Sequence, residues 1–331
     1  DPWLHSVDEI EQYKRSMANT EITLQATQNL VDIIWKDQPS APTEKSFPYE
    51  DEFAGATQSS KRKTLAKELK INGNSAAVIT LPEGIAWLLN IRGGDVEHLP
   101  IVQAFSILHS NNEVDIFVDK RKVENLKEHF GDGINLYNEN DFLSQLTTLT
   151  GSICIDKSSL PFAAYEGLLA SKATLDPRGD ITALPKACKN EIELSRARDA
   201  HLIDAIAMCK FLCWLNSQSA GILTEIDIVI ELESFRSANP ELYDISFETI
   251  CASGPNAALP HYRVNNDSNR TIKNGEVILI DSGGQYKSGT TDITRTTALG
   301  QVSSEIKQAF TLVLKGMISI SKLRFPKGMA G

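Results

Sequence analysis

The stretch ILIDSGGQYKSGTTDITRT, residues 278–296, carries more structural information than any other part of this sequence. Two runs of β-strand character flank the turn signal KSG at 287–289 and predict an antiparallel hairpin. Asp281 and Asp292 lie on opposite sides of that turn. Directly opposed residues of such a hairpin point to the same face, so we expect the two carboxylates to converge. The turn lies slightly beyond their midpoint, and a bulge would absorb the difference.

Two neighbouring carboxylates at the end of a buried strand repel each other unless a cation compensates their charge. Asp281 follows the apolar run 277–280, which is typical of a buried strand. Carboxylate oxygens suit Mn²⁺ or Zn²⁺, so Asp281 and Asp292 are candidates for half of a metal site. The alternative is an exposed hairpin whose aspartates face water. Spacing alone favours that alternative, because Asp is common near turns.

Among the six histidines, His261 has the most informative context, GPNAALPHYRV. The preceding Gly, Pro and Asn place it in or after a loop. A lone histidine is more often a surface or packed residue, so its context leaves a functional role open. His201 lies on the apolar side of a helical pattern and is expected to pack, whereas His98 is expected in a loop. The absence of HExxH and GxSxG leaves zincin and serine-hydrolase chemistry without support.

The composition is that of an ordinary globular protein and argues against two classes of partner. The 331 residues are enough for two or three domains, and 41% of them are apolar and 23% charged. A net charge of −10 disfavours nucleic-acid binding, which needs a basic surface. No run approaches the roughly 20 apolar residues of a membrane helix, and no secretory signal is visible. We therefore expect neither nucleic-acid nor membrane partners.

The cysteines and the two ends of the chain add two further expectations. Five cysteines are an odd number and form no CxxC, which favours a reduced, cytoplasmic compartment. Cys209 and Cys213 lie in an apolar helical pattern and are expected in the core. The chain opens inside a structured segment and closes just after an amphipathic helix, so we expect a fragment of a longer protein.

Residues 57–180 alternate between helical and strand patterns and predict a compact α/β domain. Its first helix is expected to have Ser59 or Ser60 as N-cap, and Pro82 is placed for the first turn of the next helix. A hairpin is expected at Asn111-Asn112. The domain has no GxGxxG and no P-loop, so nothing in it indicates a nucleotide site.

From about residue 186 long helical patterns and short strand runs replace this alternation. A long amphipathic helix comes first, followed by a second helix capped by Thr224, strand runs that include the hairpin, and a final helix over 303–323. One apolar face of the first helix is predicted from steps of three and four residues. Its members are Leu194, Ala197, His201, Ala205, Met208 and Leu212.

Taken together, IAWLLNIRGGDVEHLP, GPNAALPHY and EVILIDSGGQYKSGTTDITRT resemble the Xaa-Pro aminopeptidases (aminopeptidase P) in their three-domain cytosolic form. The similarity covers essentially the whole chain, and the stretch 276–296 is highly specific. The resemblance implies an α/β (α+β) fold with a creatinase-like N-terminal-type domain and then the first half of a pita-bread catalytic domain. It implies that 1–56 end a first domain and its linker, 57–182 form the second domain, and 183–331 begin the catalytic domain.

The resemblance also assigns site residues. Asp281 and Asp292 match the first two metal ligands of the family, and His261 matches the histidine that binds substrate and steadies the tetrahedral intermediate. Two divalent ions are implied, with Mn²⁺ expected first and Zn²⁺ or Co²⁺ as alternatives. The remaining ligands of the family, one His and two Glu, belong to a second half of the pita-bread domain that this sequence does not contain. Pro260 stands where the family has a small or aliphatic residue, so the backbone around His261 is expected to differ.

The implied activity is hydrolysis of the N-terminal residue from peptides with proline in second position, by a homodimeric cytoplasmic enzyme. The fragment itself is expected to be inactive, and its site to be without metal or to hold it weakly. Two alternatives remain open: a non-catalytic pita-bread protein that only binds partners, and a creatinase-like hydrolase without metal. The paired aspartates weigh against both.

Overall fold

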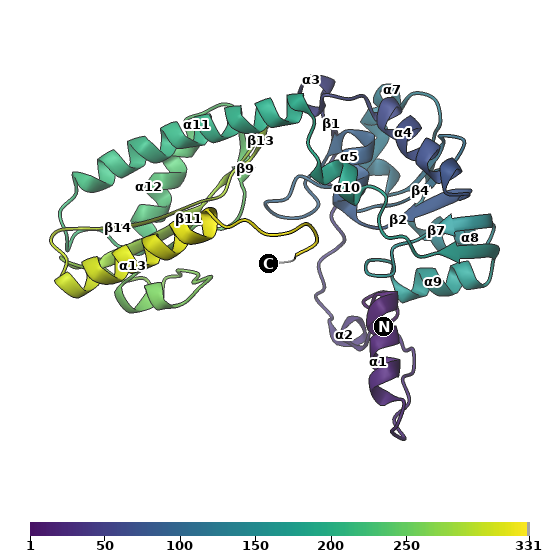
Figure 1. Ribbon diagram of the computed structural model, residues 1–331, viewed down its shortest axis with the longest axis horizontal. Coiled ribbons are helices and arrows are strands. Elements are labelled where there is room, and N and C mark those ends of the chain that lie inside the picture. Colours follow the sequence, from purple (N-terminus) through teal and green to yellow (C-terminus); the bar gives the residue numbers. More distant parts are fainter. Residues whose placement is uncertain (330–331) are drawn as a thin grey trace. The chain divides into compact units, whose positions relative to one another are not determined.

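In the computed structural model, whose described residues are 1–329, the chain divides into two compact units, Asp1–Arg196 and Ala197–Gly331 (Figure 1). The first unit is built on a six-stranded mixed sheet with the order β6-β5-β4-β2-β7-β8. In that order the strands are Ile134–Tyr137, Val114–Phe117, Phe105–His109, Ala76–Ile79, Thr150–Cys154 and Lys172–Asp176. The predicted hairpin is confirmed, because β4 and β5 pair antiparallel across Asn112, which has a φ of 80°.

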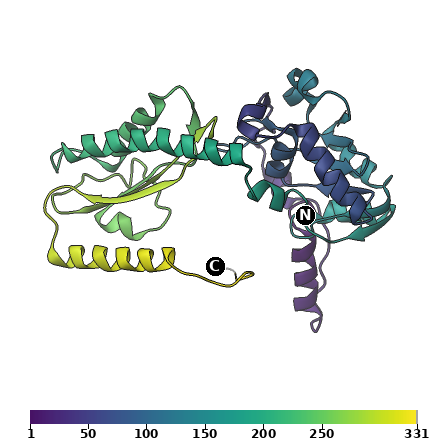
Figure 2. The same cartoon turned by 45° about the horizontal axis from the view of Figure 1, so that its top comes forward.

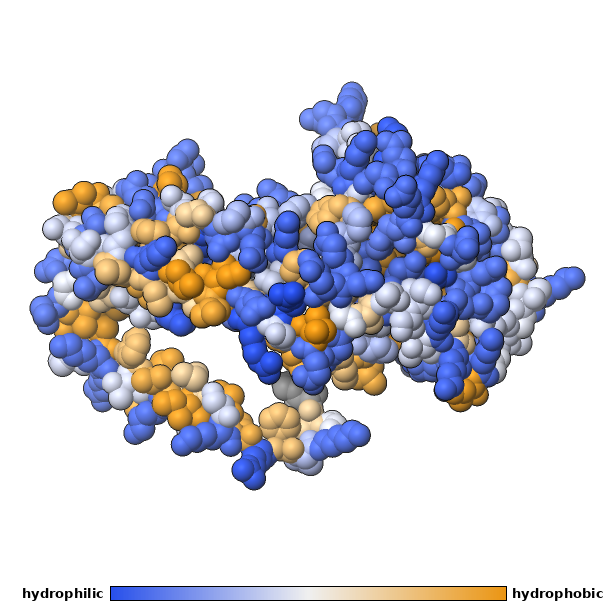
Figure 3. Space-filling view, turned by 90° about the horizontal axis from the view of Figure 1, so that it is seen from above, coloured by the Kyte–Doolittle hydropathy of each residue, from blue (hydrophilic) through white to orange (hydrophobic). Residues whose placement is uncertain are grey.

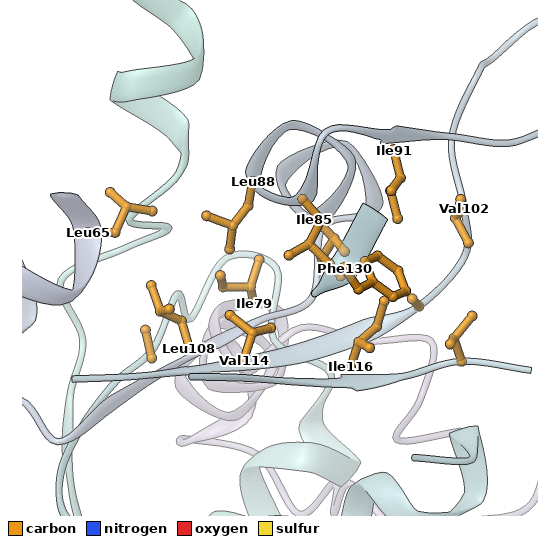
Figure 4. Packing of buried hydrophobic residues seen from close by; sticks show 14 of the residues in the cluster. Leu65, Ile79, Ile85, Leu88, Ile91, Val102, Leu108, Val114, Ile116 and Phe130 are labelled. Atoms are coloured by element: carbon orange, nitrogen blue, oxygen red, sulfur yellow. The ribbon is translucent and has the colours of Figure 1, made fainter. Parts of the chain in front are cut away.

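Helices cover both faces of this sheet, as the alternation of side chains along its strands requires. Ala77 and Ile79 of β2 face one core with the helices α4 (Gln58–Ile71) and α5 (Pro82–Leu89). Figure 4 shows this cluster, with Leu65, Ile85 and Leu88 pointing at Ile79 and its neighbours. The other residues of β2 face a second core with α8 (Phe142–Leu146) and α9 (Phe162–Leu169). This unit is the α/β domain that the sequence predicts.

The remaining elements of the first unit are short, apart from the N-terminal helix. That helix, α1, begins after Ser6, which forms a capping box with Glu9. The strands β1 and β3 form a two-stranded sheet. The other elements are α1 (Val7–Met17), α2 (Leu30–Ile34), β1 (Phe47–Pro48), α3 (Asp51–Ala54), β3 (Ile91–Arg92), α6 (Lys120–Val123), η1 (Glu124–Leu126), α7 (Lys127–Phe130), η2 (Glu139–Asp141) and α10 (Ala183–Ala187).

The second unit contains two small antiparallel sheets and three long helices (Figure 2). One sheet has the order β10-β11-β14, with β10 at Ile250–Ser253, β11 at Val277–Ser282 and β14 at Ile293–Ala298. The other has the order β13-β12-β9. Its strands are Gly289–Thr290, Gly284–Tyr286 and Leu242–Ile245. The helices are α11 (Glu191–Asn216), α12 (Glu225–Ser237) and α13 (Ser304–Ser321), and a short η3 (Gly254–Ala258) follows β10.

The core of the second unit lies between the first sheet and the helices α11 and α12. Cys251, Ile278 and Ile280 point from the sheet into this core, where Phe211 of α11 and Leu232 of α12 pack. Thr224 caps α12 through a capping box with Asp227, as the sequence predicts for Thr224. Helix α13 lies along the opposite side of this sheet and buries none of its residues (Figures 1 and 2).

Several sequence-based expectations about the helices are wrong. The cap of α4 is Thr57, whose side chain accepts a hydrogen bond from the Ser60 amide, rather than Ser59 or Ser60. Cys209 and Cys213 are exposed rather than in the core, and so is His201. Only Met208 of the predicted α11 face is buried. The buried face consists of Ala200, Asp204, Ala207, Met208, Phe211 and Leu215.

The error on α11 has a physical cause. Asp204 lies at the centre of the buried face, where the Arg236 guanidinium compensates its charge in a salt bridge of 2.7 Å. A pattern reading that excludes an aspartate from the buried face shifts most of that face by one position and places His201 on it instead. The strands β8 and β9 also escaped prediction, because both are short and only partly buried. Within residues 1–329, no helix has the length and apolar character needed to cross a membrane.

Candidate metal centre

Asp281 and Asp292 belong to one long hairpin made of β11, β12, β13 and β14. The ladder pairs Asp281 with Thr294, and the β11–β14 and β12–β13 pairs keep a single register. That register places Asp292 opposite Gly283. The two aspartates are therefore diagonal neighbours rather than directly opposed, which corrects the sequence-based expectation, and the hairpin needs no bulge between them.

The diagonal arrangement still brings the two carboxylates together. Positions 281 and 283 share one side of the strand, and so do their partners across the ladder. The charge of Asp281 is close enough to help raise the pKa of Asp292, and Thr294 donates its hydroxyl to Asp281 Oδ1 at 2.7 Å. The predicted convergence is confirmed. We call this side of the sheet, which also carries Ile250 opposite Asp281, the aspartate face.

Gly283 keeps the position opposite Asp292 free of a side chain. A Cβ atom at Gly283 would lie 2.0 Å from the Thr291 carbonyl oxygen and 2.2 Å from Ser246 Oγ. Ser246 donates its amide to the Gly283 carbonyl at 3.1 Å and its hydroxyl to the Thr291 carbonyl at 2.9 Å. This close approach of a third segment admits only glycine, so the GG of the motif has a packing reason.

The electrostatics of the pair favour a bound cation. Partial burial and then the neighbouring charge of Asp281 raise the pKa of Asp292, and the hydrogen bond between the two carboxyls raises it further. Two acceptors in contact need either a shared proton or a metal ion to bridge their charge. Asp281 is half-buried and Asp292 exposed, so their oxygens are accessible to an ion. The residues present fit a divalent metal through two carboxylate ligands.

The described residues supply only part of a ligand set. Across positions 1–329, no group of three or more His, Cys, Asp or Glu side chains is arranged to hold a metal ion. A dinuclear site needs more ligands than two carboxylates provide. Within residues 1–329, Asp281 and Asp292 therefore do not by themselves make a complete ligand set for a metal ion.

His261 lies in the loop after η3, with an exposed side chain and a φ of 59°. Within residues 1–329, its ring makes no hydrogen bond or ion pair with Asp281 or Asp292. The next residue, Tyr262, packs against Ile250, the strand partner of Asp281. The structure therefore places the His261 loop on the aspartate face without a direct bond from the histidine to the carboxylates.

Sequence reasoning missed the residues that support this site. Thr294 could have been found, because it follows Asp292 by two residues and strand alternation puts both on one face. Glu225 could not, because it lies 37 residues before its partner Tyr262 and the fold alone brings the two side chains together. Asn256, which also bonds Glu225, reads in the sequence only as a loop residue.

Comparison with known proteins agrees with this geometry. Residues 37–193 match the model of the creatinase/prolidase N-terminal domain, and residues 195–331 match that of metallopeptidase family M24. The two matches together cover residues 37–193 and 195–331. The creatinase-type domain corresponds to most of the first unit, and the M24 domain contains Asp281, Asp292 and His261. The fold class expected from the sequence, an α/β creatinase-like domain followed by pita-bread structure, is confirmed.

Individual relatives of this chain carry consistent names. It is 35% identical over 346 residues to a probable Xaa-Pro aminopeptidase P of Coccidioides posadasii, covering 100% of this chain and 53% of that protein. It is 34% identical over 368 residues to Aminopeptidase P2 of Arabidopsis thaliana, covering 100% and 52%. The chain thus spans about half the length of the curated relatives it matches.

A solved structure closely follows the whole chain. The X-prolyl aminopeptidase of Caenorhabditis elegans, described as a cytosolic enzyme with a di-nuclear active site, superposes with a TM-score of 0.92 at 29% identity. The match covers 100% of this chain and 56% of the nematode chain. The two units described above are therefore those of an aminopeptidase P fold.

Proposed function

We propose that the protein containing this chain is a metal-dependent aminopeptidase that releases the N-terminal residue from peptides with proline in second position. The observation that carries the proposal is the placement of Asp281 and Asp292, two carboxylates, on one face of the hairpin within the segment that matches metallopeptidase family M24. The reaction and the substrate class come from the relatives named Xaa-Pro aminopeptidase P and from the nematode X-prolyl aminopeptidase.

Asp281 and Asp292 are assigned as ligands of two divalent ions, by analogy with the di-nuclear site of the nematode enzyme. Mn²⁺ is the first choice because oxygen ligands suit it, and Zn²⁺ and Co²⁺ are alternatives. When bound, such ions lower the pKa of a water molecule and polarise the scissile carbonyl. The contribution of the chain itself is to hold the carboxylates in place, with Thr294 bonded to Asp281 and Gly283 admitting the close approach of Ser246 to the hairpin.

His261 is assigned as the catalytic residue that donates a hydrogen bond to the oxyanion formed at the scissile carbonyl. Its exposed ring, free of protein partners within residues 1–329, leaves both nitrogens available to a substrate. A preorganised donor of this kind typically contributes about 3–4 kcal/mol to transition-state stabilisation. The donor must be held before the substrate arrives, because ordering it during the reaction would cancel part of that gain.

Three further parts of the proposal concern location, domain limits and assembly. The cytoplasmic location follows the description of the nematode enzyme as cytosolic. The division into 1–56, 57–182 and 183–331 is part of the proposal and is supported by the change from one family match to the other between residues 193 and 195. Homodimerisation rests on the family resemblance alone. A non-catalytic binding protein or a metal-free creatinase-like hydrolase would have no need for the repulsive Asp281–Asp292 pair.

The decisive variant is Asp292→Asn in the whole protein that contains this chain. We expect hydrolysis of an Xaa-Pro-Pro peptide to fall by about a thousandfold or more, because a lost ligand removes metal-derived stabilisation worth several kcal/mol. Bound metal, measured by elemental analysis, should fall in parallel. The matched control is Asp267→Asn, which neutralises an exposed aspartate in the same domain and should leave both quantities unchanged. Near-normal turnover by Asp292→Asn would refute the assignment.

The 331-residue chain alone provides a second readout of the same experiment. With two carboxylates as its only gathered ligands within residues 1–329, it should bind Mn²⁺ weakly in a calorimetric titration. Asp292→Asn should abolish that binding and Asp267→Asn should preserve it. Two tightly held ions per isolated chain would contradict the assigned ligand set.

A further inference from the structure

Glu225 is the only charged residue within 197–329 that combines complete burial with hydrogen-bond partners from the His261 loop. Its Oε1 accepts hydrogen bonds from the amide and the hydroxyl of Ser253, at 2.7 and 2.9 Å. Its Oε2 accepts from Asn256 Nδ2 at 3.0 Å and from the Tyr262 hydroxyl at 3.1 Å. Both oxygens are therefore satisfied by groups that belong to one short segment, 253–262.

Glu225 remains acceptable as a buried acid because of its place in the fold. It is the first residue of α12, after the N-cap Thr224, so the unpaired amides of the helix start favour a negative charge there. Four donors surround the carboxylate, which is the number that a fully bonded anion needs. Burial, and also the bond to Glu225, raise the pKa of the Tyr262 hydroxyl, which therefore keeps the proton that it donates.

The two anchors of the segment bracket His261. Asn256 precedes it and Tyr262 follows it directly, and Asn256 Nδ2 lies 2.9 Å from the Tyr262 hydroxyl. Glu225, Asn256 and Tyr262 thus close a ring of hydrogen bonds at the base of the loop. Ser268 extends the ring, with its Oγ 2.9 Å from the same hydroxyl.

The ring is attached to the sheet that carries the aspartates. Ser253, the last residue of β10, pairs with Ile278 of β11. Its hydroxyl also accepts a hydrogen bond at 2.7 Å from Arg270, which is itself paired with Glu276. The Tyr262 ring lies in a cluster with Ile250 on the aspartate face. Displacement of Tyr262 would therefore move the loop relative to Asp281.

The loop has few other means of holding its shape. None of the residues of η3 is buried, and Leu259 and His261 are exposed. His261 also has a left-handed backbone, with φ at 59°, which a residue with a Cβ adopts only when its surroundings impose it. His261 is thus strained and exposed, and it lies between Asn256 and Tyr262, whose side chains both bind the buried carboxylate of Glu225.

We propose that Glu225 is a positioning residue for His261, acting through Asn256 and Tyr262, which fix the loop backbone on both sides of the histidine. The inference rests on the proposed function, since it presumes that His261 acts on a substrate. The carboxylate presets the left-handed conformation before the substrate arrives and does not touch the substrate itself. Loss of the ring releases the histidine while leaving Asp281 and Asp292 in place.

The test compares Tyr262→Phe with Tyr286→Phe. Both tyrosines are almost buried, 8% and 6% exposed, and each donates to a buried carboxylate, Tyr286 to Asp204 at 2.8 Å. Each substitution removes one such bond and should lower overall stability alike. In the whole protein labelled at histidine, Tyr262→Phe should shift and broaden the His261 ring signals, whereas Tyr286→Phe should not. Signals are assigned with His261→Gln.

Hydrogen exchange supplies a second readout of the same pair. Amides of 254–262 should exchange about tenfold faster in Tyr262→Phe than in Tyr286→Phe, as loss of one hydrogen bond to a charged group predicts. Glu225→Gln retains the shape of the side chain but puts an amide donor opposite Asn256 Nδ2. It should therefore also speed the exchange of amides 254–262. Unchanged His261 signals and exchange rates in both Tyr262→Phe and Glu225→Gln would overturn the proposal, even if both variants were less stable.

Activity separates the positioning role from the function on which it rests. In the whole protein, Tyr262→Phe should lower kcat for an Xaa-Pro-Pro peptide with little change in KM and in bound metal. If spectra and exchange respond but the wild type hydrolyses no such peptide, the proposed function fails while the positioning of His261 stands. If the wild type is active and the His261 signals are unchanged in Tyr262→Phe and Glu225→Gln, the positioning role is refuted while the proposed function stands.

Discussion

At the residue scale, the left-handed backbone of His261 is the feature with the clearest energetic consequence. With a φ of 59°, any residue that has a Cβ is strained by about 1–2 kcal/mol, and glycine is not. We expect His261→Gly to be more stable than His261→Ala by about 1 kcal/mol in urea denaturation, although glycine normally costs stability. The control is Arg263, which is exposed and has no positive φ. There the glycine variant should be the less stable one, and the same order at both positions would contradict the strain.

The repulsion between Asp281 and Asp292 should lower the stability of the folded chain when no metal is bound. At neutral pH two charges in contact repel, so in the presence of EDTA Asp292→Asn should stabilise the chain by about 0.5 kcal/mol after solvent screening. The raised pKa of Asp292 determines how the stability gain of Asp292→Asn changes with pH. The repulsion exists above the raised folded pKa and is gone below the ordinary value of 3.8, so the gain should vanish on acidification. Asp267→Asn should show no such gain, and a destabilised Asp292→Asn at pH 7 would contradict the repulsion.

At the scale of elements, the Arg270–Glu276 ion pair fastens the start of β11 to the base of the His261 loop. Arg270 bonds both oxygens of Glu276, at 2.8 and 2.9 Å, and the Lys273 amide adds a third bond. The Arg270 guanidinium, more than any other group, lowers the pKa of Glu276 below its usual 4.5. A lowered pKa in an acid contributes stability that is present above 4.5 and lost as the pH falls through the folded value.

Glu276→Gln should therefore destabilise the protein by about 1 kcal/mol at pH 7 and by progressively less below pH 4.5. Urea denaturation at a series of pH values measures the difference. The matched control is Glu248→Gln, because the Arg263–Glu248 pair is 3.0 Å long but about half exposed. It should change stability by only a few tenths of a kcal/mol at any pH. A loss in Glu276→Gln that stayed constant with pH would contradict the lowered pKa of Glu276.

The same elements indicate how far sequence reasoning reaches. The hairpin that carries Asp281 and Asp292 and the cap at Thr224 are local, and alternation or a single side chain predicts them. The diagonal register was not predicted, because the ladder turns at Lys287 and Ser288, one position past the midpoint of the two aspartates, and no bulge restores direct opposition. Glu225 and Asp204 escaped for another reason. Each is a carboxylate whose burial is tolerated only because partners distant in the sequence bind it in the folded chain.

At the scale of the whole molecule, α13 presents an apolar stripe that nothing within residues 1–329 covers. Phe310, Val313, Met317 and Ile320 are each at least half exposed and recur at steps of three and four (Figure 3). An open groove of about 780 Å³ lies between the helix and the aspartate face, lined by Phe310, Val313 and Met317 on one side and by Val277 and Thr296 on the other. Helical stability of this kind normally comes from burial of such a stripe, and an exposed one favours association.

We therefore expect the 331-residue chain to self-associate at micromolar concentrations and to bind a hydrophobic dye such as ANS. The double variant Val313→Lys/Ile320→Lys should shift the sedimentation coefficient toward the monomer and lower the dye fluorescence, because it places two charges on the stripe. The control is Leu184→Lys, which replaces a comparably exposed leucine of the first unit, 72% exposed against 73% for Val313. It should alter neither quantity, because single apolar residues scattered on a surface are ordinary. A wild-type chain that sediments as a monomer at all concentrations without binding dye would contradict this account of α13.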